Sequence, residues 1–206
     1  MNLRDLTEDD LPAAASLLAN GLRDNPLYMT VIDRSTEDRE RALTRLFEGA
    51  VRRVFRGGAL EGAFEDERLV GVCGRVAPGE CRLGFFERLM IVPSLAMRHS
   101  LSIALRLHEL AAEFTRRDPS HPHWHFGPLA VPRSMRGKGI GTALLRSFCA
   151  RMDRERTAAY LETDRDANVP FYEREGFSVA RREPVLGVPC WFMTRASRAG
   201  EREHFS

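Results

Sequence analysis

Apolar residues recur at helical spacing in two stretches of the first third of the chain. The first stretch follows Thr7, a residue type that caps helices, and continues until Pro26 interrupts it. The second covers residues 36–55, with apolar residues on one side and arginines on the other, and ends at a Gly-Gly pair. Residues 2–6 alternate as a short strand does. The pattern therefore predicts a strand followed by two helices.

Strand patterns follow in the middle of the chain. Residues 59–65 and 68–77 are separated by an Asp-Glu pair, and the second run contains Leu69, Val70, Val72 and Val76, which favour a strand, so the two runs predict a hairpin. Residues 96–117 return to helical spacing and end at an Asp-Pro pair.

Strands and helices alternate in the last third of the chain. The expected segments are a strand over 124–131, a helix from Ile140, a strand over 158–163, a short helix over 171–175, and strands over 177–180 and 190–194. This order predicts an α/β domain around a mixed sheet.

Composition narrows the class of protein. The chain has 206 residues, of which 43% are hydrophobic and 29% charged, so we expect one soluble globular domain over 1–206. No apolar run approaches the roughly 20 residues of a membrane span, and the N-terminus has no apolar signal core. The net charge of +2, without a block of like charges, argues against a nucleic-acid-binding arm. Four scattered cysteines predict reduced thiols and a cytoplasmic location.

Residues 136–141 read Arg-Gly-Lys-Gly-Ile-Gly and stand between an expected strand and an expected helix. Glycines let the backbone approach an anion closely, and the N–H groups and dipole of a helix start then hold the anion. Arg136 and Lys138 add positive charge, and Lys138 is the only lysine of the chain. The spacing matches neither the dinucleotide nor the Walker motif. We interpret the segment as a phosphate cradle, with an ordinary strand–helix turn as the alternative.

This segment resembles the R/Q-x-x-G-x-G/A signature of the GNAT superfamily of N-acetyltransferases. Residues 160–177, which include Tyr-Leu-Glu-Thr and Asn-Val-Pro-Phe-Tyr-Glu, resemble the segment that follows the signature in that family. The resemblance covers residues 121–195. Within the family, this segment is similar to the subgroup that includes puromycin N-acetyltransferase.

The resemblance implies a fold and a co-substrate. The fold is a mixed, mostly antiparallel twisted sheet that is splayed between its fourth and fifth strands and flanked by helices. Acetyl-CoA lies in that gap, with residues 121–195 as the acetyl-CoA-binding half and residues 1–120 as the acceptor half. A glycine inside a strand also favours a bulge, here at Gly127-Pro128. The implied acetyl-CoA-binding residues are Leu129, Ala130, Val131, Arg136, Gly137, Lys138, Gly139, Ile140, Gly141, Thr142, Asn168 and Tyr172.

Tyr172 matches the tyrosine with which the family assists departure of the CoA thiolate. A phenol near pKa ~10 and a thiol near ~8.5 make full proton transfer uphill by ~2 kcal/mol. We therefore expect Tyr172 to act as a hydrogen-bond donor to the developing thiolate, with a shifted pKa aiding completion. The alternative to this role for Tyr172 is that it only packs on a short helix. The alternative to CoA binding for Asn168 is that it only caps that helix. A main-chain N–H near residues 129–131 is the expected oxyanion donor.

A base is also needed, because an alkylamine is mostly protonated at neutral pH. The candidates are Glu162, His125 and Glu87. Glu162 ranks slightly first, because an acid inside an otherwise apolar strand is costly unless it is paired or functional. His125 shares a strand face with His123. For each histidine, a structural role remains the alternative.

We expect transfer of an acetyl group from acetyl-CoA to a primary amine of a small molecule, with a protein amine second. A non-catalytic acyl-CoA-binding module is a further alternative. Residues 26–28 and 95–117 are expected to wall the acceptor site. His121, His123 and His125 lack a nearby cysteine or carboxylate to complete a metal site, so no metal is expected. No helix–turn–helix pattern is evident, and the oligomeric state stays open, a homodimer included.

Overall fold

The chain folds around a seven-stranded sheet with the order β1-β2-β3-β4-β5-β7-β6. A computed structural model describes residues 1–79 and 100–197 of the chain, apart from the side chains of residues 57 and 58. Neighbouring strands pair antiparallel, except for β4 and β5, which are parallel. The strands are β1 (Asn2–Asp5), β2 (Gly58–Glu65), β3 (Arg68–Val76), β4 (His123–Ala130), β5 (Ala158–Thr163), β6 (Ser178–Val185) and β7 (Val188–Arg195).

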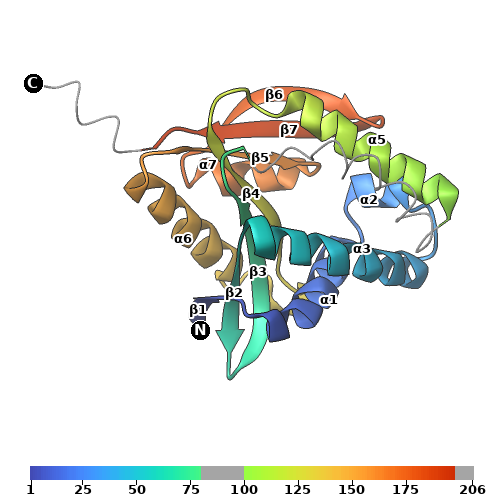
Figure 1. The fold of residues 1–206 in the computed structure, drawn as a ribbon, viewed down its shortest axis with the longest axis horizontal. Coiled ribbons are helices and arrows are strands. Elements are labelled where there is room, and N and C mark those ends of the chain that lie inside the picture. The colour runs from blue at the N-terminus through green and yellow to red at the C-terminus, as the bar shows by residue number, and fades with distance from the viewer. Residues whose placement is uncertain (80–99, 198–206) are drawn as a thin grey trace, which may run out of the picture.

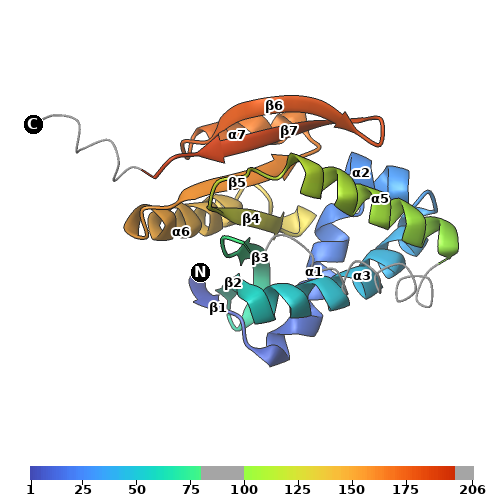
Figure 2. The same ribbon diagram turned by 45° about the horizontal axis from the view of Figure 1, so that its top comes forward.

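Helices cover both faces of this sheet (Figures 1 and 2). On one face, α1, α3 and α5 bury an apolar core that includes Leu18, Leu43 and Leu107. On the other face, α6 buries a second core that includes Leu144 and Phe148. The helices are α1 (Leu11–Leu22), α2 (Pro26–Val31), α3 (Thr36–Gly57), α5 (Leu101–Arg117), α6 (Ile140–Arg154) and α7 (Val169–Glu173), with short 3-10 turns at Glu8–Asp10, Arg133–Met135 and Asp166–Asn168.

The predicted order of elements is confirmed, with one helix missed. The sequence predicted that Pro26 interrupts the first helical stretch. In the structure Pro26 stands in the first turn of a further helix, α2, where proline is well tolerated. β6 is longer than the sequence predicted. Seven of its eight residues are exposed or half-buried, so the strand has no alternation of apolar and polar residues by which it could be recognised. The part of the expected helix before residue 100 lies outside the described residues.

The two parallel strands separate part of the way along β4. His123, Trp124 and His125 pair with Ala158, Ala159 and Tyr160, and the recorded pairing ends there. β4 itself continues to Ala130. The strands therefore open toward the carboxyl end of β4, which confirms the predicted splay between the fourth and fifth strands.

β4 also carries a bulge where the opening begins. Leu129 pairs with Cys73 and Phe126 pairs with Arg75, so Gly127 and Pro128 together oppose Gly74. Gly127 has a φ of 142°, which a side chain would disfavour. The bulge expected from the glycine is thus present in the described strand.

Candidate functional site

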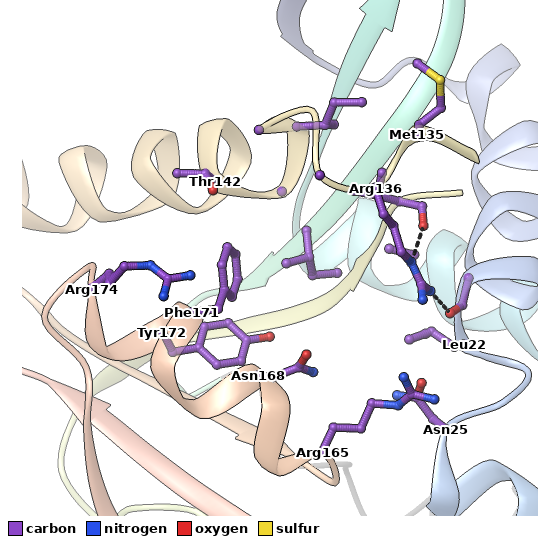
Figure 3. A pocket seen from close by; sticks show the side chains of 18 residues that line it. Leu22, Asn25, Met135, Arg136, Thr142, Arg165, Asn168, Phe171, Tyr172 and Arg174 are labelled. Carbon is purple, nitrogen blue, oxygen red and sulfur yellow. Dashed lines mark hydrogen bonds between the residues drawn. The ribbon is translucent and has the colours of Figure 1, made fainter. Parts of the chain in front are cut away.

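A cavity of about 500 Å³ lies at the opening between β4 and the segment that follows β5. Figure 3 shows that its walls come from the end of α1, the glycine turn, the start of α6 and α7. We refer to it as the glycine-turn cavity. Its lining residues are Gly21, Leu22, Asn25, Leu129, Ala130, Val131, Met135, Arg136, Gly137, Gly139, Ile140, Gly141, Thr142, Arg165, Asn168, Phe171, Tyr172 and Arg174.

The glycine turn owes its shape to two left-handed residues. Gly137 has a φ of 78° and Gly139 a φ of 80°, and Gly139 is the N-cap of α6. A Cβ atom at either position would meet nothing within 4 Å, so the requirement for glycine is conformational. The first N–H groups of a helix have no partner within the helix and carry positive partial charge. The start of α6 therefore offers donors to an anion in the cavity.

Three arginines line the same cavity, namely Arg136, Arg165 and Arg174. Arg136 donates to the carbonyl oxygens of Gly21, at 3.0 Å, and Val131, at 3.4 Å (Figure 3). Burial, together with the nearby cations, lowers the pKa of Arg136 from its ordinary value. A guanidinium nevertheless stays charged in proteins, so this crowding of cations attracts an anion.

Sequence reasoning overlooked Arg165, which follows β5. Its Nη2 atom donates to the carbonyl oxygen of Asp24 at 2.7 Å. Its Nε atom is buried and donates no hydrogen bond within the described part of the chain. A buried cation with a spare donor beside a phosphate-type cradle fits a bound anionic group. No spacing along the sequence signals this role, because it depends on where α1 ends.

Lys138 does not line the cavity, unlike the other predicted acetyl-CoA-binding residues. Its Nζ atom lies 3.4 Å from the sulfur of Met135, and the residue is exposed. Asn168 does line it, but its side chain makes no capping hydrogen bond to α7. Instead, Asn168 Nδ2 donates to Thr163 Oγ1 at 3.1 Å. The capping expected for this side chain is therefore wrong.

Tyr172 of α7 lines the glycine-turn cavity, and its hydroxyl points toward Asn168 (Figure 3). The residue is buried, with 7% of its surface exposed. Burial, followed by the charges of Glu162 and Asp164, raises the pKa of Tyr172 well above its ordinary value. The phenol therefore stays protonated as a donor. The shift has the opposite sign to the one that would complete proton transfer, so the expected help from the pKa is wrong.

A second cavity, of about 260 Å³, lies on the other side of Tyr172. We refer to it as the acidic cavity because two carboxylates line it. Five residues line both cavities, so the two meet at this point. The residues shared are Leu22, Asn25, Leu129, Asn168 and Tyr172. The remaining lining residues are Leu27, Tyr28, Leu110, Phe114, His125, Phe126, Gly127, Pro128, Glu162, Thr163 and Asp164.

The structure brings Glu162 and His125 together in the acidic cavity. Their Oε2 and Nε2 atoms are 3.0 Å apart, and their side chains are 17% and 22% exposed. The same Glu162 oxygen is buried and accepts no hydrogen bond of good geometry within the described residues. The parallel register of β4 and β5 causes this meeting, because His125 pairs with Tyr160, two residues before Glu162.

His123 has a structural position instead. It is 4% exposed, and its ring nitrogens contact the His121 carbonyl oxygen at 2.9 Å and Asp118 Oδ1 at 3.1 Å. It lines neither of the two cavities. Glu87, the third candidate base, lies outside the described residues. Within residues 1–79 and 100–197, no group of three or more His, Cys, Asp or Glu side chains could hold a metal ion.

Asp164 is a second acidic residue that sequence reasoning overlooked. One carboxylate oxygen accepts the N–H of Leu27 at 2.9 Å, and the other accepts Asn25 Nδ2 at 3.1 Å. Burial raises the pKa of Asp164 above its ordinary value. Asp164 therefore fixes the start of α2 against the end of β5. Its position two residues after Glu162, on the same strand face, was the available signal.

Replacing Gly74 by Ala is expected to disturb the bulge between the two cavities. The new Cβ would lie 2.6 Å from the carbonyl oxygen of Gly127, which a real Cβ does not tolerate. We expect a loss of about 1–3 kcal/mol in stability and roughly a tenfold loss of kcat for the reaction that the site catalyses, measured by thermal unfolding and steady-state kinetics. Gly49→Ala is the control, because its Cβ meets nothing within 4 Å and α3 gains about 0.5–1 kcal/mol. Unchanged stability and kcat in Gly74→Ala would contradict this role.

The separated parallel strands, the bulge and the glycine turn at the start of α6 are the features that the resemblance to acetyltransferases led us to expect. The chain belongs to the GNAT family of acetyltransferases, whose family model matches residues 25–177. The resemblance seen in residues 121–195 is thereby confirmed at the level of the family. The narrower likeness to puromycin N-acetyltransferase stays a prediction.

Solved structures of acetyltransferases share this fold. A structure described as histone acetyltransferase HPA2 and related acetyltransferase from Corynebacterium glutamicum has a TM-score of 0.73 at 23% identity, over 95% of this chain and 96% of that one. Arylalkylamine N-acetyltransferase 2 from Aedes aegypti has a TM-score of 0.70 at 11% identity, over 95% and 98%. Ribosomal-protein-alanine N-acetyltransferase from Brucella melitensis has 0.57 at 16% identity, over 95% and 99%. At these identities the likeness establishes the fold.

The described residues bear on two features predicted from the sequence, the lack of a membrane span and the state of the cysteines. None of their helices is both long and apolar enough to cross a membrane. Cys73, Cys149 and Cys190 are buried as thiols rather than joined in disulfides.

Proposed function

We propose that the protein transfers the acetyl group of acetyl-CoA directly to a primary amine of a small molecule. The observation that carries this proposal is that two cavities meet at Tyr172 and Leu129. One has the features of a phosphate cradle, and the other holds an acid beside a histidine. A thioester from the first side and an amine from the second side would meet at the bulge of β4.

The residues of the glycine-turn cavity fit acetyl-CoA, which supplies the activated acetyl thioester. In this proposal its pyrophosphate is bound by the N–H groups of the glycine turn and of the start of α6, and by the side chains of Arg136 and Arg165, which line the same cavity. Beyond His125, β4 has no recorded pairing with β5, so main-chain groups of residues 129–131 on that side are available to the pantetheine arm. In this proposal residues 121–195 bind the co-substrate and residues 1–120 shape much of the acceptor side.

The acidic cavity supplies the proton chemistry of the acceptor. The ammonium group of the acceptor gives a proton to Glu162. His125, whose Nε2 atom lies 3.0 Å from Glu162 Oε2, either interacts with the Glu162 carboxyl group during this transfer or accepts the proton from it. The neutral nitrogen then forms a bond to the acetyl carbon. Main-chain N–H groups of residues 129–131 stabilise the oxyanion. When the carbon–sulfur bond breaks, Tyr172 donates a hydrogen bond to the thiolate. The nitrogen, now bonded to the acetyl carbon, loses its extra proton to give the amide, and the thiolate takes up a proton to leave as CoA thiol. The proton first taken by Glu162 passes to solvent.

Thermal unfolding with acetyl-CoA, desulfo-CoA, NAD and ATP, each at ~1 mM, tests the co-substrate. A ligand at 100 times its Kd stabilises the fold by about 2.7 kcal/mol, or roughly 5–10 °C for a chain of this size. We expect this shift with the two CoA species and not with NAD or ATP. Absence of a shift with either CoA species would contradict the proposal.

Replacing Gly139 by Val is expected to abolish that shift, because φ at this position is 80° and the turn would have to change shape. Gly187→Val is a matched control. It also has a φ of 80° and nothing within 4 Å of its Cβ, but it lies in the turn between β6 and β7. Both variants should lose stability, and only Gly139→Val should lose the response to CoA in the unfolding measurement. Equal responses would show that the turn does not bind the co-substrate.

A further inference from the structure

The acidic cavity is lined by two chemically different sets of side chains. Glu162, near the end of β5, and Asp164, which follows that strand, line it together with His125. Apolar side chains of α2 and α5 also line it, namely Leu27, Leu110 and Phe114. An acceptor that fills the cavity therefore presents both a cation and apolar surface to the lining.

The two cavities differ in the basic side chains that the described residues contribute to them. Among the residues that the structure describes, no lysine or arginine lines the acidic cavity, whereas three arginines line the glycine-turn cavity. A carboxylate next to the reacting amine would thus be buried beside Glu162 and Asp164 without a cationic partner. Burying a charge in this way is costly. The lining therefore disfavours α-amino acids as acceptors.

The acceptor's ammonium group has a defined place in the cavity. Asp164 already accepts two hydrogen bonds from α2 and the residue before it. Glu162 Oε2, in contrast, is buried, lies 3.0 Å from His125 Nε2 and accepts no other hydrogen bond from the described residues. Glu162 therefore retains acceptor capacity for an ammonium hydrogen, and Asp164 adds negative charge to the same cavity.

The volume of the cavity limits the size of the acceptor. At about 260 Å³ it lies just below the roughly 300–1,000 Å³ of pockets for drug-sized ligands. One ring or a short branched chain therefore accompanies the ammonium. A polyamine would bring a second ammonium into a small cavity that Leu110 and Phe114 also line, and its desolvation would be costly.

We infer that the acceptor is a compact monoamine with an aromatic or branched-alkyl body and no carboxylate beside its ammonium. This inference rests on the proposed acetyl transfer and adds the chemical class of the acceptor. The juxtaposition that carries it is a single cavity, which Tyr172 also lines, where the acidic residues at the end of β5 and the apolar side chains of α2 and α5 come together.

Acetyl-transfer kinetics with matched amines test the class of acceptor. The probes are 2-phenylethylamine, phenylalanine, phenylalanine amide, 1,4-diaminobutane and a short peptide that begins with alanine. We expect kcat/KM for 2-phenylethylamine to exceed that for phenylalanine by about 100-fold. Phenylalanine amide should recover most of the difference, because it has the size of the amino acid without its negative charge. The diamine and the peptide should be poor substrates.

A substitution in the apolar wall gives an independent test. Phe114→Arg introduces a cation into the lining of the acidic cavity, and we expect it to lower the preference for 2-phenylethylamine over phenylalanine by about tenfold. The desulfo-CoA shift in thermal unfolding verifies that the variant folds and binds the co-substrate. If it does not fold, Leu110→Ala replaces it, and KM for 2-phenylethylamine should rise about tenfold through lost apolar contact.

The outcomes separate the inference from the proposed function. If acetyl-CoA shifts unfolding but phenylalanine, the diamine or the peptide reacts as well as 2-phenylethylamine, the inferred acceptor class is wrong and acetyl transfer stands. If 2-phenylethylamine neither reacts nor adds a shift in the presence of desulfo-CoA, the inference is also overturned. If no CoA species shifts unfolding and no amine is acetylated, the proposed function itself fails.

Discussion

Replacing Glu162 by Gln is expected to lower kcat/KM for amine acetylation about 1,000-fold at neutral pH. The amide keeps the shape of the side chain but cannot accept the proton of the ammonium group, and it cannot form an ion pair with His125. Because alkylamines titrate near about pH 10, the variant should regain activity as pH rises and more of the amine is already neutral. A pH profile of kcat/KM for both proteins measures this recovery.

Glu155→Gln is the matched control for this substitution. Glu155 is exposed, lies at the carboxyl end of α6 and lines neither cavity. The activity of the Glu155→Gln variant should therefore equal that of the unaltered protein. Both variants should keep the CoA response in thermal unfolding. Full activity of Glu162→Gln at neutral pH would remove Glu162 from the proton-transfer step and leave His125 as the base.

Replacing Tyr172 by Phe is expected to lower kcat about 100-fold while KM for acetyl-CoA changes little. The ring keeps its contacts with Phe126, Phe171 and Phe177, and only the hydroxyl is lost. The raised pKa of Tyr172 has a second consequence, because a buried phenol stays protonated where a free one would ionise. Kinetics of the unaltered protein should therefore show no loss from phenol ionisation up to about pH 10.

The stability of the fold limits the pH range of that measurement. Because the pKa of Tyr172 is raised in the folded state, its contribution to stability is complete below its ordinary pKa of about 10 and is lost as pH rises above that value. Assays below pH 10 thus compare folded proteins. If Tyr172→Phe retains full kcat there, the hydroxyl serves packing alone, which was the alternative derived from the sequence.

The sequence predicted the glycine turn well because its information is local. Residues 136–141 specify a left-handed turn and a helix start through their own backbone preferences, without help from the rest of the chain. Lys138 shows where this reasoning fails. Its proximity in sequence to the cradle says nothing about the direction of its side chain, which lies against Met135.

The acceptor side was harder to predict because tertiary contacts assemble it. Glu162 and His125 were separate candidates, and only the register of β4 and β5 brings them together. Asp164 was missed because its partners are in α2, a six-residue helix whose first-turn proline suggested an end. Long-range pairings of this kind leave no periodic pattern along the chain.

The origin of the acidic cavity's walls has an implication for protein engineering. Leu27 and Phe114 belong to helices that contribute nothing to the glycine turn, while Glu162 and Tyr172 belong to elements beside it. If the proposed function holds, substrate range is encoded in different segments from donor binding and proton transfer. A library restricted to the cavity-facing positions of α2 and α5 would sample new acceptors while the acetylation chemistry stays intact.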